Sequence, residues 1–289
     1  MCSMFHSFQR NRGFTAEIIT QENASGKRFL RRAFILHAMI RLIEELSLNA
    51  WPAPRQMLLD GWVLRFAGGY TRRANSVHIL GRGERPSEGK IAECERVYQR
   101  EGLPCVFKMT RAAGEELESE LAGRGYSRSE SVSIQTLDLG GRDFAGDGQV
   151  QMAAAYEQAW GDAYAQVNSV RPALRPAMDA ILRGIVPERR FAIVQADGQP
   201  VSAGLAVLER GWVGLFDIVT RADQRRNGHA TCVINTLLAW AKEQGATKAY
   251  LQVVTTNSAA LPLYARMGFV EAYQYWYRVR SQSSVVRGQ

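Results

Sequence analysis

The stretch QRRNGHATCVINTLLAW, residues 224–240, places two arginines and a glycine directly before an apolar pattern with helical spacing. The first N–H groups of a helix have no partners within the helix, and the helix dipole makes this end attractive to anions. Gly228 lets a bulky anion approach the backbone, and Arg225 and Arg226 add charge-assisted contacts to phosphate. The stretch therefore predicts a pyrophosphate site. The alternative is an exposed basic helix start with a structural glycine.

The predicted elements follow a similar order in both halves of the chain. In the first half we expect strands over 59–68, 75–81, 103–110 and 126–139 and helices over 87–102 and 113–125. In the second half we expect helices over 151–160, 173–184, 229–244 and 258–268 and strands over 191–196, 201–208, 212–219, 248–254 and 269–280. Each half ends with helix, strand, helix and strand. This order indicates an internal duplication, although chance recurrence of a common βα arrangement would also produce it.

Two motifs on these elements resemble the GNAT superfamily of N-acetyltransferases. RRNGHA, residues 225–230, matches the pattern R/Q-x-x-G-x-G/A, and NSAALPLYARMGF, residues 257–269, matches the downstream pattern N-x-x-A-x-x-x-Y-x-x-x-G-F. The resemblance covers roughly residues 150–280. It implies an α/β fold of tandem GNAT-like domains, each a mixed, mostly antiparallel central sheet flanked by helices.

The domain organisation follows from this resemblance and from the composition. Residues 46–140 lack the R/Q-x-x-G-x-G/A turn, so we expect them to form a degenerate GNAT-like domain without a cofactor site. The remaining segments are an N-terminal extension with an amphipathic helix (1–45), a glycine-rich linker (141–148), the catalytic GNAT domain (149–282) and a tail (283–289).

The resemblance implies acetyl-CoA as co-substrate and no metal. Its pyrophosphate would lie on the backbone N–H groups of 225–230, and its pantetheine arm would pair with strand 213–219 like an added strand. This arrangement requires strands 212–219 and 248–254 to splay apart. A backbone N–H near the end of the first strand would polarise the thioester carbonyl. The expected cofactor-binding residues are Ile218, Val219, Arg225, Arg226, Asn227, Gly228, His229, Ala230, Thr231 and Asn257.

The resemblance also implies that Tyr264 protonates the leaving thiolate. The reference pKa of tyrosine, about 10, lies above that of a thiol, about 8.5, so the phenol suits this role. Pro262 lies two residues earlier and can kink the short helix. Asn257 matches a residue that caps this helix and reaches the cofactor, and capping alone would also explain it. A core role is the alternative for Tyr264.

Asp217 is the candidate general base. It alternates with Leu215 and Val219 along a predicted strand, so we expect it on their face, where it could take a proton from the acceptor amine. A structural role for Asp217, Glu209 as the base, and ordered water alone stay open. Sequence reasoning gives the acceptor pocket two candidate walls: the aromatic residues Tyr156, Trp160 and Tyr164, and the stretch 68–77 with Arg72, Arg73 and Asn75. Core packing and a solvated turn are the respective alternatives.

Composition limits the classes of partner. The chain has 289 residues and a net charge of +8, yet its basic residues are spread along the sequence, which does not favour nucleic acid. No apolar run approaches the roughly 20 residues that span a bilayer. The four cysteines show neither metal spacing nor a disulfide framework, which favours a cytoplasmic protein.

The favoured hypothesis is therefore an acetyl-CoA-dependent N-acetyltransferase that acts on a small-molecule or peptide amine. A homodimer is left open. One alternative is a catalytically inert acyl-CoA-binding sensor or scaffold protein, and another is a nucleic-acid-associated protein that uses the basic charge.

Overall fold

The computed structural model describes residues 34–280. Residues 1–33 of the predicted extension and the predicted tail 283–289 lie outside the described residues. A helix covers residues 34–50, and its first part, 34–42, belongs to a separate unit from the one that begins at Ile43. The unit from Ile43 onward holds the sheet and the helices that flank it. No helix in the described part of the chain is long and apolar enough to cross a membrane.

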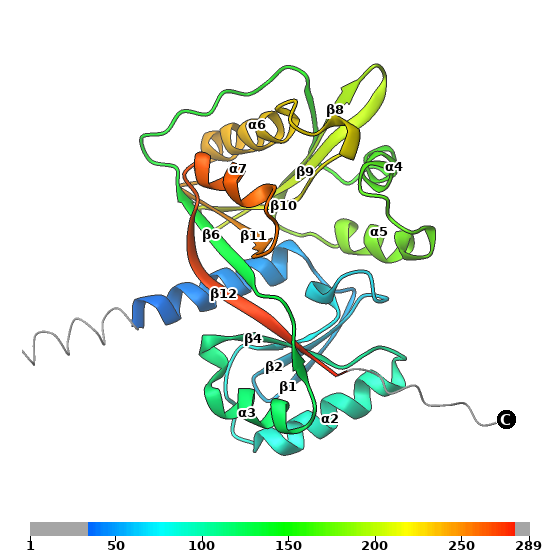
Figure 1. Cartoon of the computed structure of the whole chain (residues 1–289), viewed down its shortest axis with the longest axis vertical. Coiled ribbons are helices and arrows are strands. Elements are labelled where there is room, and N and C mark those ends of the chain that lie inside the picture. The colour runs from blue at the N-terminus through cyan, green and yellow to red at the C-terminus, as the bar shows by residue number, and fades with distance from the viewer. Residues whose placement is uncertain (1–33, 281–289) are drawn as a thin grey trace, which may run out of the picture. The chain divides into compact units, whose positions relative to one another are not determined.

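One mixed sheet runs through this unit, in the strand order β1-β2-β3-β4-β12-β6-β11-β10-β9-β8-β7, with β5 paired to β12 (Figure 1). Its strands are β1 Arg55–Leu59, β2 Trp62–Phe66, β3 Val77–Ile79, β4 Val106–Thr110, β5 Ser127–Arg128, β6 Val132–Asp138, β7 Val150–Ala153, β8 Glu188–Ala196, β9 Gln199–Glu209, β10 Trp212–Thr220, β11 Lys248–Val254 and β12 Val270–Val279. The helices after residue 50 are α2 Ser87–Arg100, α3 Glu115–Gly123, α4 Gln158–Val167, α5 Arg175–Arg183, α6 His229–Glu243 and α7 Ala260–Arg266. The predicted α/β fold with a mixed central sheet and flanking helices is confirmed.

Three predicted elements in this order differ from the structure. The predicted strand 126–139 is interrupted at 129–131, between β5 and β6. The predicted strand 59–68 is divided by a hairpin turn at Asp60 and Gly61, whose φ angles of 44° and 83° suit a two-residue Asp-Gly turn. The predicted helix 151–160 is replaced by β7 and by a helix that begins at Gln158. Antiparallel pairing of β7 with β8 overrides the helical propensity of its Gln, Met and Ala residues.

The two halves of the chain repeat the same strand arrangement. In the first half β2 pairs antiparallel with β3, which pairs parallel with β4 across α2. In the second half β9 pairs antiparallel with β10, which pairs parallel with β11 across α6.

The last strand of each half is exchanged. β6 follows β4 in the chain but pairs with β11, while β12 follows β11 but pairs with β4. Figure 1 shows β6 and β12 running together across the centre of the sheet. A division of the chain at 141–148 therefore leaves each half without the strand that closes its own sheet.

The helices of the second half cover both faces of the sheet. The apolar stripe of α6, which includes Val233, Ile234 and Leu237, packs in one cluster with α7 and with Val213 and Leu215 of β10. The opposite face carries α4, whose Trp160 stacks on Tyr164 and donates from Nε1 to the carbonyl of Ala192. These layers place the starts of α6 and α7 at the edge where the parallel strands β10 and β11 end.

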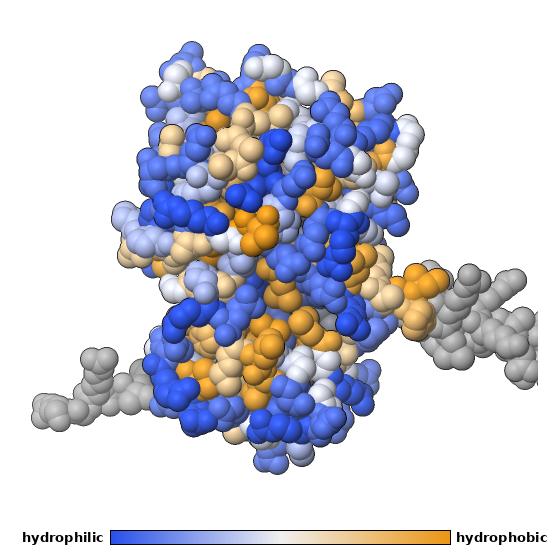
Figure 2. All heavy atoms as spheres, turned by 180° about the vertical axis from the view of Figure 1, so that it is seen from behind, coloured by the Kyte–Doolittle hydropathy of each residue, from blue (hydrophilic) through white to orange (hydrophobic). Residues whose placement is uncertain are grey.

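In the first half, α2 and α3 cover one face of β1–β4. Their side chains form a second cluster with Trp62, Phe66 and Phe107. Trp62 is buried. The view from behind shows hydrophilic residues over most of the upper part of the molecule and a group of hydrophobic residues on the lower part (Figure 2).

Candidate functional site

The strands β10 and β11 diverge in the middle of the second half. Their parallel ladder pairs Trp212 with Lys248 and ends where Leu215 pairs with Leu251. Beyond that point β10 continues to Thr220 beside β9 alone. The backbone edge of β10 beyond Leu215 is thus free of β11, which is the splay that a paired pantetheine arm requires.

The start of α6 is open. Gly228 stands at its N-cap in the left-handed region, with φ 83°, and a Cβ there would meet nothing within 4 Å. Among the described residues no side chain caps this end, and its first turn holds no acidic residue. The first intrahelical bond runs from the Cys232 N–H to the carbonyl of Gly228 at 3.0 Å. The N–H groups before Cys232 are therefore available to an anion.

The predicted pyrophosphate residues lie together in this turn. Arg225, Arg226, Asn227 and Gly228 are exposed, while His229, Ala230 and Thr231 are partly buried in the first turn of the helix. The sequence places them together because they are contiguous, and the structure adds the left-handed glycine and the uncapped helix end.

Asp217 lies in a β-bulge of β10. The register with β9 shifts between Phe216 and Val219, so Asp217 and Ile218 oppose no partner, and Asp217 has a φ of 51°. The expectation that Asp217 shares the face of Leu215 is wrong, because the bulge interrupts the alternation. Leu215 packs in the α6 cluster, whereas Asp217 faces Arg73 on the other side of the sheet.

The Asp217 carboxylate is buried and only partly satisfied. Its Oδ1 lies 3.4 Å from an Nη of Arg73, and its Oδ2 has no hydrogen-bond partner. Burial raises the pKa of Asp217, while Arg73 and the nearby Tyr164 hydroxyl act in the opposite direction. An unpartnered oxygen and a raised pKa suit a carboxylate that accepts a proton during a reaction.

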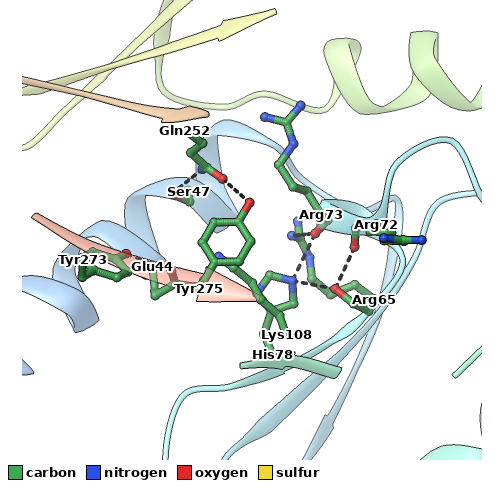
Figure 3. Close-up of polar contacts among 11 residues, drawn as sticks. Glu44, Ser47, Arg65, Arg72, Arg73, His78, Lys108, Gln252, Tyr273 and Tyr275 are labelled. Carbon is green, nitrogen blue, oxygen red and sulfur yellow. Dashed lines mark hydrogen bonds and ion pairs between the residues drawn. The ribbon is translucent and has the colours of Figure 1, made fainter. Parts of the chain in front are cut away.

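A braced loop of the first half carries Arg73. The Asn75 Oδ1 accepts from the N–H groups of Ala67 and Gly69 at 2.8 and 3.0 Å, and the Asn75 Nδ2 donates to the Thr71 carbonyl. The Arg73 carbonyl accepts from Arg65 Nη1. These bonds hold the backbone of residues 67–75 and leave the Arg73 side chain free to point away from Arg65 (Figure 3).

Two aromatic rings flank the Arg73 guanidinium. It lies 4.5 Å from the ring of Trp51 and 5.8 Å from that of Phe216, and these two rings stack with centroids 6.2 Å apart. Trp51 also donates from Nε1 to Thr71 Oγ1 at 2.9 Å. Sequence reasoning pointed to Arg73 but missed Trp51 and Phe216. The stretch WPAP around Trp51 was the available signal, because two prolines beside a tryptophan hold the backbone rigidly.

The other two side chains of stretch 68–77 that were singled out do not face Asp217. Arg72 is exposed and lies 6.0 Å from the ring of Tyr277, and Asn75 is buried in the loop bracing. Glu209, the other candidate base, accepts from Asn49 Nδ2 and lies 3.3 Å from Arg210.

Tyr264 and Asn257 lie on and before α7. Helix α7 begins at Ala260, so Pro262 falls in its first turn, where a missing N–H breaks no intrahelical bond. The Asn257 Oδ1 accepts from the Ala260 N–H at 3.0 Å and so caps this helix. Tyr264 is buried, packs edge-to-face on Phe269, and burial raises its pKa to about 12. Its ring is therefore part of the core.

The residues of the predicted aromatic wall lie mostly in the core, and one of them, Tyr164, also lies near Asp217. Trp160 and Tyr164 are buried, and Tyr156 donates from its hydroxyl to Asp179 at 2.5 Å. Tyr164 accepts from Asn168 Nδ2 at 2.8 Å, and its hydroxyl lies close enough to Asp217 to affect the pKa of that carboxyl.

The corresponding turn of the first half is closed by its own carboxylate. In this turn, between β3 and α2, the N–H groups of Glu84 and Arg85 donate to Asp60 at 3.0 and 2.8 Å. The buried Lys90 Nζ lies 3.3 Å from the same carboxylate. These backbone bonds lower the pKa of Asp60. The Asp60 carboxylate thus occupies the N–H groups that could otherwise bind an anion.

Within residues 34–280, no three His, Cys, Asp or Glu side chains are grouped so that they could hold a metal ion.

Comparisons with known proteins identify a family. The model of the family described as "Probable histone acetyltransferase Rv0428c C-terminal" matches residues 37–278. The relative "Uncharacterized N-acetyltransferase YobR" of Bacillus subtilis is 29% identical over 245 residues, which cover 83% of this chain and 98% of that protein. "Probable histone acetyltransferase Rv0428c" of Mycobacterium tuberculosis is 27% identical over 81% of this chain and 72% of its own length.

A solved structure shares the fold. The GCN5-related N-acetyltransferase from Kribbella flavida superposes with a TM-score of 0.60 at 16% identity, covering 85% of this chain and 96% of that chain.

Proposed function

Because the chain belongs to the Rv0428c C-terminal acetyltransferase family of the GNAT superfamily, we propose that it transfers the acetyl group of acetyl-CoA directly to a primary amine. The observation that carries the choice of donor is the open end of α6 beside the diverging strands β10 and β11. An uncapped helix start with a left-handed glycine suits a pyrophosphate, and a free strand edge suits a chain of amides.

Acetyl-CoA, when bound, supplies the acetyl group as a thioester. Arg225, Arg226 and the N–H groups of the turn that follows would hold its pyrophosphate. The backbone at Ile218 and Val219, on the side of β10 that β11 leaves free, would face the thioester end. Their positions support this assignment, because the turn lies at the end of the strand that carries the bulge. Asn257 would reach the same edge from the start of α7.

The protein groups available for proton transfer are Asp217 and Tyr264. Asp217 would accept the proton of the attacking amine, since its Oδ2 lacks a partner and burial raises its pKa. Tyr264 would donate to the leaving thiolate. A pKa of about 12 keeps the phenol protonated at neutral pH, as a proton donor must be.

The charge of the chain bears on the kind of amine. The Mycobacterium tuberculosis relative is named a probable histone acetyltransferase, which suggests a lysine of a basic protein as one acceptor. This chain carries a net charge of +8, and like charges slow the approach of a basic protein. The proposal therefore favours a small amine.

Calorimetric titration with acetyl-CoA tests the proposed site on a matched pair of variants. Gly228→Glu puts a side chain and a negative charge at the start of α6, and we expect it to weaken binding by about 10- to 100-fold. Gly245→Glu is the control, because Gly245 also has a positive φ of 87° and open space but lies beyond the other end of α6. We expect its affinity to match the wild type.

Release of free thiol in the presence of amines tests the transfer itself. Equal affinity in both glutamate variants would contradict the pyrophosphate site. Binding of acetyl-CoA without thiol release from any amine would contradict the transferase and favour the acyl-CoA sensor.

A further inference from the structure

Arg73 lies beside Asp217, and this pair of opposite charges bears on which charged groups the acceptor carries. This paired site of Arg73 and Asp217 brings together two residues 144 positions apart, one from the braced loop 67–75 and one from the bulge of β10. We propose, resting on the transferase function above, that the acceptor is an amine with a carboxylate beside it, as in an α-amino acid. Asp217 would bind the amino group and Arg73 the carboxylate.

The pair has unused hydrogen-bonding capacity. Arginine has five N–H donors, yet in the described part of the chain the Arg73 guanidinium makes one hydrogen bond, at 3.4 Å to Asp217. The Asp217 Oδ2 is buried and accepts no hydrogen bond of ordinary geometry, although the Tyr164 hydroxyl is close enough to lower the pKa of this carboxyl. A ligand that carries a cation and an anion on neighbouring atoms satisfies both groups at once.

The Arg73 guanidinium lies beside two aromatic rings. It is 4.5 Å from the ring of Trp51 and 5.8 Å from that of Phe216, and these two rings stack on each other with centroids 6.2 Å apart. Contact with the Trp51 ring limits the orientations of the planar guanidinium, whose fork of donors suits two-pronged binding of a carboxylate. The Arg73 side chain is 24% exposed, so its free donors are within reach of a ligand.

The bracing of the loop does not depend on the charge of Arg73. Asn75 and Arg65 bond to the loop backbone, Trp51 bonds to the Thr71 hydroxyl, and none of these bonds involves the Arg73 side chain. The bracing thus fixes the backbone of Arg73 without using its guanidinium, which can therefore bind a ligand. Polyamines and lysine-rich peptides do not suit this site, because Arg73 would repel their additional positive charges.

The neighbourhood of the pair is aromatic. Trp51 stacks on Phe216 and on the partly buried Tyr70. Trp51 and Phe216 are 1% and 2% exposed, so among these rings only the partly buried Tyr70 offers surface to an apolar side chain of the acceptor. We therefore expect the acceptor to resemble leucine or phenylalanine more than glutamate or lysine.

Pairs of acceptors that differ by the carboxylate test this inference. Thiol release from acetyl-CoA is measured with L-phenylalanine against 2-phenylethylamine, with L-leucine against 3-methylbutylamine, and with a lysine-rich peptide. Each pair is compared between wild type and Arg73→Gln, so that the different basicities of the amines cancel. Arg72→Gln is the control, since Arg72 is exposed and lies beside Tyr277.

We expect Arg73→Gln to lower kcat/KM for the amino acids by about 10- to 100-fold, mainly through KM, because charge-assisted hydrogen bonds to the carboxylate are lost. The carboxylate-free amines should lose less than the amino acids, because they lose only the effect of Arg73 on Asp217. Arg73→Lys should restore part of the loss, and Arg72→Gln should match the wild type. Thermal unfolding of each variant checks that the loop is intact.

Two results would overturn the inference and leave the transferase standing. One is thiol release from the amines or the peptide but not from the amino acids. The other is an equal effect of Arg73→Gln on both members of each pair. No thiol release from any acceptor would overturn the proposed function and this inference together.

Discussion

The turns that follow β3 and β10 have equivalent places in the two halves. The first is occupied by a carboxylate of the chain, and the second is open. Each lies between a strand and a helix, at the end of a short parallel ladder. The turn before α2 has backbone N–H groups that donate to Asp60, with Lys90 as the counter-charge. The turn before α6 has a left-handed glycine, no cap and open space.

The glycines of the two turns show the same difference. A Cβ on Gly83 would approach the Asp60 carboxylate to 2.2 Å, whereas a Cβ on Gly228 would meet nothing. The same backbone arrangement can thus be completed by the chain or left for a ligand. The expectation that residues 46–140 hold no cofactor site has a physical reason here, because the Asp60 carboxylate already accepts from the N–H groups of this turn.

The two aspartates of these halves differ in the same sense. Asp60 accepts hydrogen bonds with both oxygens, and these bonds lower its pKa. Asp217 has one unpartnered oxygen, and burial raises its pKa. A satisfied carboxylate stabilises a fold, while an unsatisfied one is available for chemistry.

The largest expected effect is that of Asp217→Asn. Asparagine tolerates the φ of 51° but cannot accept the proton of the amine, so we expect kcat to fall by about 100-fold or more. The melting temperature should stay within a few degrees of the wild type. Thiol-release kinetics and thermal unfolding measure the two quantities. A variant that keeps full activity would show that water or another group is the base.

A second, smaller effect is the dependence of activity on pH. Asp217 must be ionised to accept a proton, so kcat/KM should decline about tenfold per unit as the pH falls through its raised pKa. The midpoint should lie above the ordinary value of about 3.9. A pH–rate profile of the wild type locates this limb. A midpoint at or below the ordinary value would contradict the role of burial at Asp217.

The smallest effect concerns stability and belongs to Asp60→Asn. The change keeps a residue suited to the turn but removes the counter-charge of the buried Lys90, so we expect the melting temperature to fall by a few degrees. Activity per folded molecule should stay at the wild-type level.

The difference in stability between wild type and Asp60→Asn should also depend on pH in a defined direction. Because the folded pKa of Asp60 is lowered, its contribution is present above the unfolded value of about 3.9 and is lost as the pH falls through the folded value. Denaturant titrations at several pH values measure it. Loss of acetyl-CoA binding in Asp60→Asn would contradict the difference drawn between the two turns, because it would show that the turn before α2 also takes part in binding.

Local chemistry made much of the second half predictable. Strand β11 matches its predicted bounds of 248–254, and α6 differs by one residue, because their patterns are long and end at clear signals such as Gly245. The hairpin at Asp60 and Gly61 was missed although an Asp-Gly pair between apolar runs is a strong turn signal. The error over 151–160 had another cause, since β7 exists only through its pairing with β8.

The sequence alone therefore determined the segments to which we assign the acyl donor. The turn 225–230 and the motif 257–269 are each a continuous stretch of sequence. Their patterns predict the starts of α6 and α7. The site of Arg73 and Asp217, to which we assign the acceptor, was decided by tertiary structure. The bulge that turns Asp217 across the sheet, the approach of Arg73 from 144 residues away and the exchange of β6 and β12 all depend on pairing between distant segments, which no local pattern of side chains encodes.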